Sequence, residues 1–266
     1  MGFFDDKVVW ITGATSGIGE ALCYELSARG ATLVLSSRRE EVLRSVQARC
    51  DNPDRHLTWR LDVLATDSFP AAHQAVLDKF GRVDILVNCA GVAQRGTALE
   101  TQLPVDHRLM DVNYFGPVAL TKTVLPGMLA RRSGHIVTIS SLMGKLHLPG
   151  RCAYAASKHA LHGFFDCLRD EVEGQGIAVT LICPGYIRTN ASFHALEGDG
   201  QPHNAWDKEI ATGLEPAKCA RRIAVAIERR RREVIVARYE GLGVYLDRFA
   251  PNLYRKVVLA KPPHTV

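Results

Sequence analysis

The sequence predicts an α/β fold in which about seven parallel strands form a doubly wound sheet with helices on both faces. Short apolar runs rich in β-branched residues alternate with segments of helical periodicity along the whole chain. The runs are apolar at nearly every position, as in strands buried on both faces of a parallel sheet. The 266 residues, 47% of them hydrophobic, suit one domain spanning residues 1–266, since no linker or repeat divides them.

The elements follow from these two periodicities in chain order. The predicted strands are short and apolar, and they lie at 7–12, 32–36, 57–61, 83–87, 135–140, 178–183 and 233–237. The predicted helices place apolar residues three and four apart, and they lie at 17–30, 39–49, 66–80, 106–132, 154–174 and 215–230. Gly30 and Gly81 end two of the helices, and Pro117 and Pro126 fall inside the longest, where proline bends or shortens a helix.

Two segments stand outside this alternation. Residues 185–213 are polar and loop-like, and a loop of this length inside an α/β domain is usually functional. We expect this loop to be a mobile substrate lid, in which Phe193 and Trp206 either line an apolar pocket or cap the core. Residues 240–266 are expected to form a C-terminal extension.

Composition excludes several classes of function. Lys and Arg exceed Asp and Glu by 33 to 28, a net charge of +5 that is too small to indicate nucleic acid. The basic run at 229–232 closes a predicted helix, where cations suit the helix dipole. The seven cysteines include no C-x-x-C pair, so neither a disulfide framework nor a metal site is expected. The N-terminal residues show no signal peptide or membrane span, which predicts a cytoplasmic protein.

A glycine-rich turn, TGATSGIG at 12–19, directly follows the first predicted strand. Glycines permit a close approach of the backbone to a ligand, and the next helix presents its N–H groups to a pyrophosphate. The spacing G-x-x-x-G-x-G after a strand therefore predicts a Rossmann-like, dinucleotide-binding fold. The residues expected to hold the cofactor here are Gly13, Thr15, Ser16, Gly17, Ile18 and Gly19.

Basic residues follow the second predicted strand, beside which the adenosine ribose of a dinucleotide lies in such folds. Ser37, Arg38 and Arg39 stand in place of the carboxylate that accepts the ribose hydroxyl of NAD, and their donors suit a 2′-phosphate. This predicts that NADP(H) is preferred over NAD(H); the alternative is that both arginines only begin a solvated helix. The cofactor contacts expected after the third and fourth strands come from Asp62, Val63, Asn88, Ala90 and Gly91.

Tyr154 and Lys158 are four residues apart and so share one face of a predicted helix. A neighbouring ammonium and a positive nicotinamide ring favour the phenolate, and lowering the tyrosine pKa by about 3 units takes about 4 kcal/mol. Tyr154 could then exchange a proton with a substrate oxygen. Ser141, at the end of the fifth strand, could hold the same oxygen, with Ser140 as the alternative. Asn113, an amide in an apolar segment, indicates a polar network.

Together these motifs resemble the short-chain dehydrogenase/reductase family in its single-domain form, over roughly residues 7–190. The resemblance implies that Tyr154 is the acid/base and that Lys158 also binds the nicotinamide ribose. It implies that Ser141 positions the substrate and that Asn113 holds a water relay. The contacts that it implies at the nicotinamide end come from Pro184, Gly185, Ile187 and Thr189. Cys89 departs from the family, which usually has a second Asn there.

The C-terminal part resembles one subgroup of this family. The residues that carry this likeness are 185–190, 195–196 and 245–254. It implies lipid-like ketones, steroids or retinoids as substrates, and the family implies a homo-oligomer, a dimer or a tetramer. The stretch 241–260 mixes apolar with basic residues, so it lies on a membrane surface, covers the substrate pocket or forms a subunit interface.

The sequence therefore predicts an NADP(H)-dependent oxidoreductase that interconverts a carbonyl and a secondary alcohol. Its expected partners are a small-molecule substrate, a second copy of the chain and, peripherally, a membrane, but no nucleic acid. The alternative is a non-catalytic NADP(H)-sensing or scaffold protein on the same fold. The complete set of four candidate catalytic residues favours the enzyme.

Overall fold

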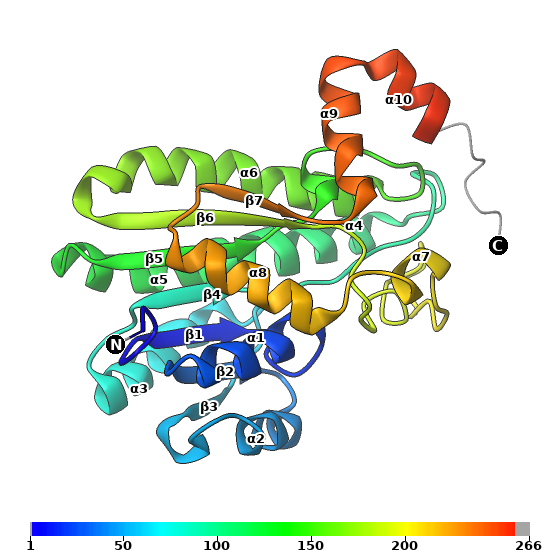
Figure 1. Ribbon diagram of the computed structural model, residues 1–266. Coiled ribbons are helices and arrows are strands. Elements are labelled where there is room, and N and C mark those ends of the chain that lie inside the picture. Colours follow the sequence, from blue (N-terminus) through cyan, green and yellow to red (C-terminus); the bar gives the residue numbers. More distant parts are fainter. Residues whose placement is uncertain (1, 259–266) are drawn as a thin grey trace.

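A seven-stranded sheet forms the centre of the structure, a computed structural model that describes residues 2–258 (Figure 1). The strands are β1 (Val8–Thr12), β2 (Thr32–Ser37), β3 (Leu57–Arg60), β4 (Ile85–Asn88), β5 (Gly134–Ile139), β6 (Ile177–Pro184) and β7 (Glu233–Val236). They are ordered β3-β2-β1-β4-β5-β6-β7, and all neighbours run parallel. The predicted fold class, a doubly wound sheet of seven parallel strands, is confirmed.

Helices cover both faces of the sheet (Figure 1). One face packs against α1 (Gly17–Ala28), α2 (Glu40–Ala48) and α8 (Pro216–Glu228). The other packs against α3 (Phe69–Phe80), α5 (Gly116–Ala130) and α6 (Cys152–Val172). Alternate residues of one strand serve the two faces: Val9 and Ile11 of β1 enter the first core, and Val8 and Trp10 enter the second.

The chain reverses its direction of travel across the sheet between β1 and β4. From β1 it moves outward to β2 and β3, returns to β4 on the other side of β1, and continues to β7. Ligands of open α/β sheets bind at such a switch point, outside the carboxyl ends of the strands. The fold thus brings the glycine turn and the ends of β4, β5 and β6 together at the edge where such folds have their ligand crevice.

The long helix predicted at 106–132 differs from the structure. Helix α4 (Leu103–Met110) begins three residues earlier, and its Pro104 lies in the first turn, where a missing N–H is tolerated. A π-helical turn (Asp111–Phe115) then joins α4 to α5, and Pro117 lies in the first turn of α5. Single π turns inside helices are often found at functional sites.

The predicted lid, residues 185–213, contains one short helix, α7 (Lys208–Ala211), and is tied down by isolated bridges. Leu196 bridges to Gln94 and to Pro202. Neither expectation for the two aromatic residues holds fully, because Trp206 is 52% exposed and Phe193 is only partly buried. That the segment moves as a lid stays a prediction.

The C-terminal part forms α9 (Leu242–Phe249) and α10 (Pro251–Val258), which project from the body of the molecule (Figure 1). The buried Tyr254 anchors them, and its hydroxyl donates to the backbone oxygen of His147 at 2.5 Å. The part of the predicted extension at 259–266 lies outside the described residues. Within residues 2–258, no helix combines the length and the hydropathy that crossing a membrane requires.

Candidate active site

The glycine turn sits at the switch point and is shaped for a ligand. Gly13 has a φ of 69°, and a Cβ there would lie 2.9 Å from the backbone of Ala90. A Cβ on Gly19 would lie 2.3 Å from the backbone oxygen of Gly13. Helix α1 starts at Gly17, and no side chain caps it at Ser16. A glycine-lined, uncapped helix N-terminus fits the pyrophosphate of a dinucleotide.

Thr12 couples this turn to the neighbouring strand end, a role that sequence reasoning did not assign. Its hydroxyl accepts from the backbone N–H of Cys89 at 3.1 Å and of Ala90 at 3.2 Å. The available signal was its position, the last residue of a strand directly before the glycines. Thr12 therefore holds the turn after β4 against the turn after β1.

The two arginines after β2 have different contacts in the structure. Arg39 reaches back over the glycine turn, and its Nη2 donates to Thr15 Oγ1 at 3.0 Å and to the Thr15 backbone oxygen at 3.3 Å. Its own backbone N–H donates to Ser37 Oγ at 3.1 Å. Arg38 is exposed and forms no hydrogen bond or ion pair within the described chain. Arg38 is thus a cation without a protein partner among the described residues, next to the end of β2.

Two of the residues proposed for the adenine side are placed by local structure. Asp62 Oδ1 accepts from the backbone N–H of Leu64 at 3.1 Å and so shapes the turn after β3. Val63 packs at the start of α5, since a Cβ on Gly116 would lie 2.8 Å from its backbone oxygen. Both residues follow the carboxyl end of β3, the edge at which the adenosine half of a dinucleotide would lie.

The side chain of Asn88 points into the core instead of the crevice. Its Nδ2 donates to the hydroxyl groups of Thr121 at 3.0 Å and Thr138 at 3.4 Å. Asn88 thus joins β4 to α5 and β5. Of the turn that follows it, the structure brings Ala90 and Gly91 to the ligand edge, where a Cβ on Gly91 would lie 3.1 Å from Asn113 Oδ1.

Tyr154 and Lys158 lie on one face of α6, and the Lys158 ammonium is 5.8 Å from the centre of the Tyr154 ring. Lys158 Nζ is buried and donates to the backbone oxygen of Ile139 at 2.9 Å. Burial lowers the pKa of Lys158 to about 8, although the thiols of Cys89 and Cys183 oppose that shift. The predicted pairing on one helix face is what the structure shows.

The protein groups alone raise the Tyr154 pKa, and the lowering expected with a nicotinamide ring beside the phenol stays a prediction. Burial of the phenol is the largest influence and raises the pKa of Tyr154. A hydrogen bond with the Ser141 hydroxyl and the charge of Arg151 act in the lowering direction. Among the protein's own groups, Ser141 and Arg151 favour the phenolate. The Lys158 ammonium lies near the face of the Tyr154 ring.

The two serines at the end of β5 face different partners. Ser141 Oγ accepts from the backbone N–H of Met143 at 3.1 Å and caps a 3-10 turn, η4 (Leu142–Gly144). Ser140 Oγ lies on the opposite side, 3.0 Å from His162 Nε2. Ser140 is therefore directed into the core, whereas Ser141 is the serine that influences the pKa of the Tyr154 phenol.

Asn113 lies in the π turn and is buried. It exchanges two hydrogen bonds of 2.9 Å with the backbone of Val92. Its Nδ2 also donates to Ser157 Oγ at 3.0 Å, and Ser157 donates to the backbone oxygen of Tyr154 at 2.8 Å. The predicted polar network exists, and Ser157 is a member that sequence reasoning did not single out.

The segment after β6 closes the other side of the crevice. Gly185 N–H donates to the backbone oxygen of Val236 at 3.0 Å, and Ile187 bridges to Leu214. The methyl group of Thr189 comes close to the start of α1, because a Cβ on Gly17 would lie 3.0 Å from it. The segment that begins at Pro184 thus reaches from the end of β6 to the phosphate turn.

Comparison with known proteins agrees with this geometry. Residues 7–198 match the family model described as short chain dehydrogenase, and the chain belongs to that family of NAD(P)-dependent oxidoreductases. The chain is 43% identical over 264 residues to dehydrogenase/reductase SDR family member 7B of Bos taurus, covering 96% of this chain and 81% of that one. Member 7B is the subgroup that the C-terminal residues resemble. The predicted family and enzyme class are confirmed.

Two solved structures share the fold. A short chain dehydrogenase/reductase from Burkholderia phymatum, in complex with NAD, has a TM-score of 0.82 at 25% identity and covers all of this chain and 99% of its own. A metagenomic short-chain oxidoreductase in complex with NADP has a TM-score of 0.72 at 28% identity, with 88% of this chain and 98% of its own covered. One of these two relatives thus binds NAD and the other binds NADP.

Proposed function

We propose that the protein is an NADP(H)-dependent oxidoreductase that interconverts a carbonyl and a secondary alcohol, with Tyr154 as general acid/base. The convergence of Tyr154, Ser141 and Lys158 at the switch point of the sheet supports this proposal. The glycine turn lies across the same crevice, so a bound dinucleotide would extend toward Tyr154. When bound, its nicotinamide supplies or accepts the hydride.

In this proposal the chain supplies position and one proton. The Tyr154 hydroxyl gives its proton to the substrate carbonyl oxygen, or takes one from the alcohol in the reverse direction. The Ser141 hydroxyl donates to the same oxygen. Lys158, fixed by the backbone oxygen of Ile139, holds positive charge beneath the phenol. Asn113 fixes the segment at Val92 beside them.

The test is Tyr154→Phe, which keeps the ring and removes the proton donor. General acid–base groups contribute about 10²–10⁴-fold, so turnover should fall by that range while NADPH still binds. The control is Tyr24→Phe, a tyrosine on α1 that bonds Glu20. Near-normal turnover of Tyr154→Phe would remove the role of Tyr154. No turnover by wild type across a panel of carbonyl compounds would favour the alternative, an NADP(H)-sensing or scaffold protein.

The proposed preference for NADP(H) rests on the cations after β2. Arg38 has no protein partner among the described residues, and Arg39 lies over the glycine turn at Thr15. Charge-assisted hydrogen bonds of about 1.5–3 kcal/mol each would make NADPH bind at least about tenfold tighter than NADH. Titrating both cofactors at fixed salt tests this, and Ser37→Asp with Arg38→Ala should reverse the preference. Equal affinities would contradict it.

We propose an apolar, lipid-like substrate for the same site. The Tyr154 ring packs against two apolar clusters, one formed by Leu142, Leu146 and Val244, the other by Val105 and Leu109, among others. A substrate oxygen at the Tyr154 hydroxyl would therefore have apolar surroundings. A series of ketones of increasing chain length should show kcat/KM rising with length, and a flat or falling series would contradict the proposal.

We propose further that the exposed face of α9 and α10 contacts an anionic lipid surface. The large apolar side chains on this segment that are at least 48% exposed are Tyr239, Leu242, Tyr245, Phe249, Leu253 and Val257. Between 238 and 258, four basic residues stand against two acidic ones. An apolar face flanked by cations is typical of interfacial helices.

Sedimentation with vesicles tests this contact. The wild type should sediment with phosphatidylserine-containing vesicles and much less with neutral ones, and Tyr245→Ser with Phe249→Ser should not sediment. Absence of wild-type binding would refute the lipid contact. A dimer or tetramer in analytical ultracentrifugation, lost in the same double variant, would assign this face to a subunit interface instead.

A further inference from the structure

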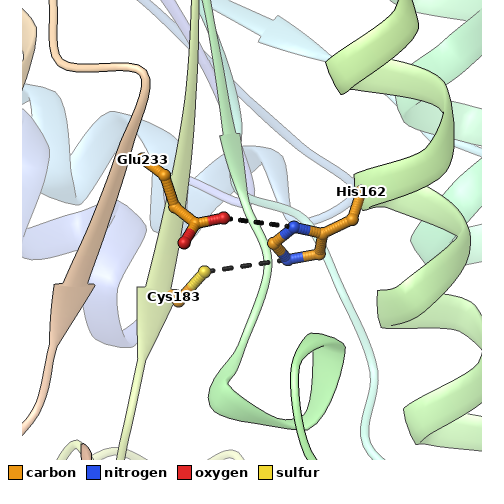
Figure 2. A group of neighbouring side chains, drawn as sticks. All are labelled: His162, Cys183 and Glu233. Carbon is orange, nitrogen blue, oxygen red and sulfur yellow. Dashed lines mark hydrogen bonds and ion pairs between the residues drawn. The ribbon is translucent and has the colours of Figure 1, made fainter. Parts of the chain in front are cut away.

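His162 is a buried imidazole to which the proposed chemistry gives no role. It lies on α6, four residues after Lys158 and eight after Tyr154, so it continues the same helix face beneath the site. Its side chain contacts groups from the ends of β5, β6 and β7, and Figure 2 shows the ring facing Cys183 and Glu233. A buried polar ring at this junction connects the segments on which the candidate site is built.

One ring nitrogen meets the residue that precedes Ser141. Nε2 of His162 is 3.0 Å from Ser140 Oγ, and the same hydroxyl lies 3.4 Å from the backbone oxygen of Lys158. Ser140 is also fixed through its backbone, since its N–H donates to the Ile182 oxygen at 2.7 Å. The imidazole therefore contacts the end of β5 one residue before the side chain that faces Tyr154.

The other ring nitrogen faces a carboxylate. Nδ1 of His162 is 3.4 Å from Glu233 Oε2, and Lys145 Nζ donates to that oxygen at 2.7 Å. The contact with His162 is the largest of the influences that hold the pKa of Glu233 at about 2, and Lys145 adds to it. Glu233 is thus an anion at neutral pH. An anion at Nδ1 favours the tautomer with hydrogen on Nδ1, which leaves Nε2 to accept from Ser140.

The turn that carries Ser141 is built against this ring. A Cβ on Gly144 would lie 2.6 Å from Ser140 Oγ and 2.8 Å from the imidazole. Cys183 Sγ, one residue before Pro184, is 3.7 Å from Nε2. The imidazole therefore fills the space between the turn after β5 and the end of β6.

A metal ion at His162, Cys183 and Glu233 fits these contacts less well, although the three donor atoms lie within 4.8 Å of one another. The carboxylate and the thiol approach different nitrogens of the ring, as Figure 2 shows, whereas one ion takes one nitrogen. Lys145 already places a positive charge on the Glu233 oxygen. Among the described residues Nδ1 has no partner at hydrogen-bond geometry, so its link to Glu233 is an electrostatic contact, and the contacts form a polar chain that needs no ion.

We propose that the chain Glu233–His162–Ser140, buried at His162 and Ser140 and exposed at Glu233, is a support that positions Ser141 against Tyr154, with His162 as a positioning residue. This inference rests on the proposed function for its catalytic consequence. Because Ser141 acts to lower the pKa of Tyr154, displacing Ser141 raises that pKa. Loss of His162 therefore alters the pH dependence of turnover as well as its rate.

The pH dependence has to be interpreted with every ionisable neighbour of His162 in view. They are Glu233 from β7, Lys145 after η4, Cys183 from β6, and Lys158 and Asp166 on α6 itself. His162→Leu leaves all five in place but removes the group that holds the Glu233 pKa down, so a change in the acid limb traces to Glu233 and a change in the alkaline Tyr154 limb traces to the support of Ser141.

The kinetic test compares two variants with a matched control. His162→Leu should lower kcat about tenfold, the effect of one lost positioning hydrogen bond, and raise the apparent pKa of the Tyr154 limb by about half a unit to one unit. His162→Gln, whose amide reaches the Nε2 position, should restore most of both. His159→Gln, an exposed histidine on the same helix, should change neither. The NADPH affinity should stay the same in all three.

The second test needs no turnover. In ¹⁵N-histidine NMR spectra, His162 should carry its hydrogen on Nδ1, and Glu233→Gln should shift the ring toward the Nε2–H tautomer. An Nε2–H tautomer in the wild type would overturn the proposed chain. An unchanged pH profile in His162→Leu would overturn the positioning role and leave the proposed function intact. Full turnover of Tyr154→Phe would overturn the proposed function and leave the tautomer result standing.

Discussion

The body of the sheet and the projecting helices α9 and α10 place their side chains in opposite ways. Within the body, polar side chains are buried in pairs, such as Lys158 on α6 with the backbone of Ile139 and His135 on β5 with Thr180 on β6. On α9 and α10, apolar side chains stand in the open, with Phe249 79% exposed. A buried polar pair fixes geometry, whereas an exposed apolar face gains only when something covers it. The first region therefore determines the stability of the fold and the geometry of the candidate site. The second determines which surface the protein contacts.

Acid should weaken the first region most. Burial lowers the pKa of His135 to about 3, against 6.5 for a free histidine. Between pH 6.5 and 3, His135 is protonated in the unfolded chain but not in the folded chain. The free energy of unfolding therefore decreases as the pH falls from 6.5 toward 3. This histidine should contribute up to about 1.4 kcal/mol of lost unfolding free energy per pH unit.

Urea unfolding at pH 7, 6, 5 and 4 measures this loss, with His135→Gln as the comparison. The amide can keep a hydrogen bond with Thr180 and takes up no proton. The slope of stability against pH should be smaller in the variant. Equal slopes would show that His135 does not carry the acid sensitivity of the buried region.

A glycine-to-alanine substitution should have opposite effects on stability at a tightly packed position near α6 and at an open one. Gly144→Ala places a Cβ against Ser140 and His162 and should destabilise by about 1–3 kcal/mol. Gly163→Ala, on the open side of α6 with no atom within 4 Å, should stabilise by about 0.5–1 kcal/mol. Chemical unfolding of both variants beside wild type gives the two signs. A neutral Gly144→Ala would contradict the close packing of the ring.

The smallest change is expected on the exposed face. Phe249→Ser should alter the unfolding free energy by no more than about 0.5 kcal/mol, because the ring loses little burial. Tyr254→Phe, on the buried side of α10, removes the hydrogen bond to His147 and should destabilise by about 1 kcal/mol. A large loss in Phe249→Ser would show that this face is covered in solution, and the contrast between the two regions would then fail.

Local sequence was enough to predict the strands and most of the site. The apolar runs identified all seven strands: the five central strands are apolar at nearly every residue because both of their faces are buried, and the edge strands β3 and β7 keep enough apolar residues to be recognised. Tyr154 and Lys158 were predicted to meet because helical spacing fixes their contact. The fold class follows from the same alternation, since consecutive parallel strands require helical crossovers.

The parts that the sequence did not predict depend on distant partners. The π turn at Asn113 is held by Ser157, 44 residues further on, and no local pattern signals that bond. The pKa of Tyr154 rises through burial, which the spacing to Lys158 does not report. His162 acquires its environment from Ser140 and Glu233, which reach it only when β5 and β7 take their places in the sheet.

The π turn between α4 and α5 also makes the packing of α4 depend on the number of residues in this turn. A five-residue turn holds one residue more than a regular α-helical turn, and each residue of an α-helix rotates the chain by about 100°. Losing a single residue between 111 and 115 would therefore rotate α4 and withdraw Val105 and Leu109 from Ala153 on α6. Apart from the buried Val112 and Asn113, the segment should accept substitutions more readily than changes in length. Related sequences are accordingly expected to differ in the residue types of this turn and not in its number of residues.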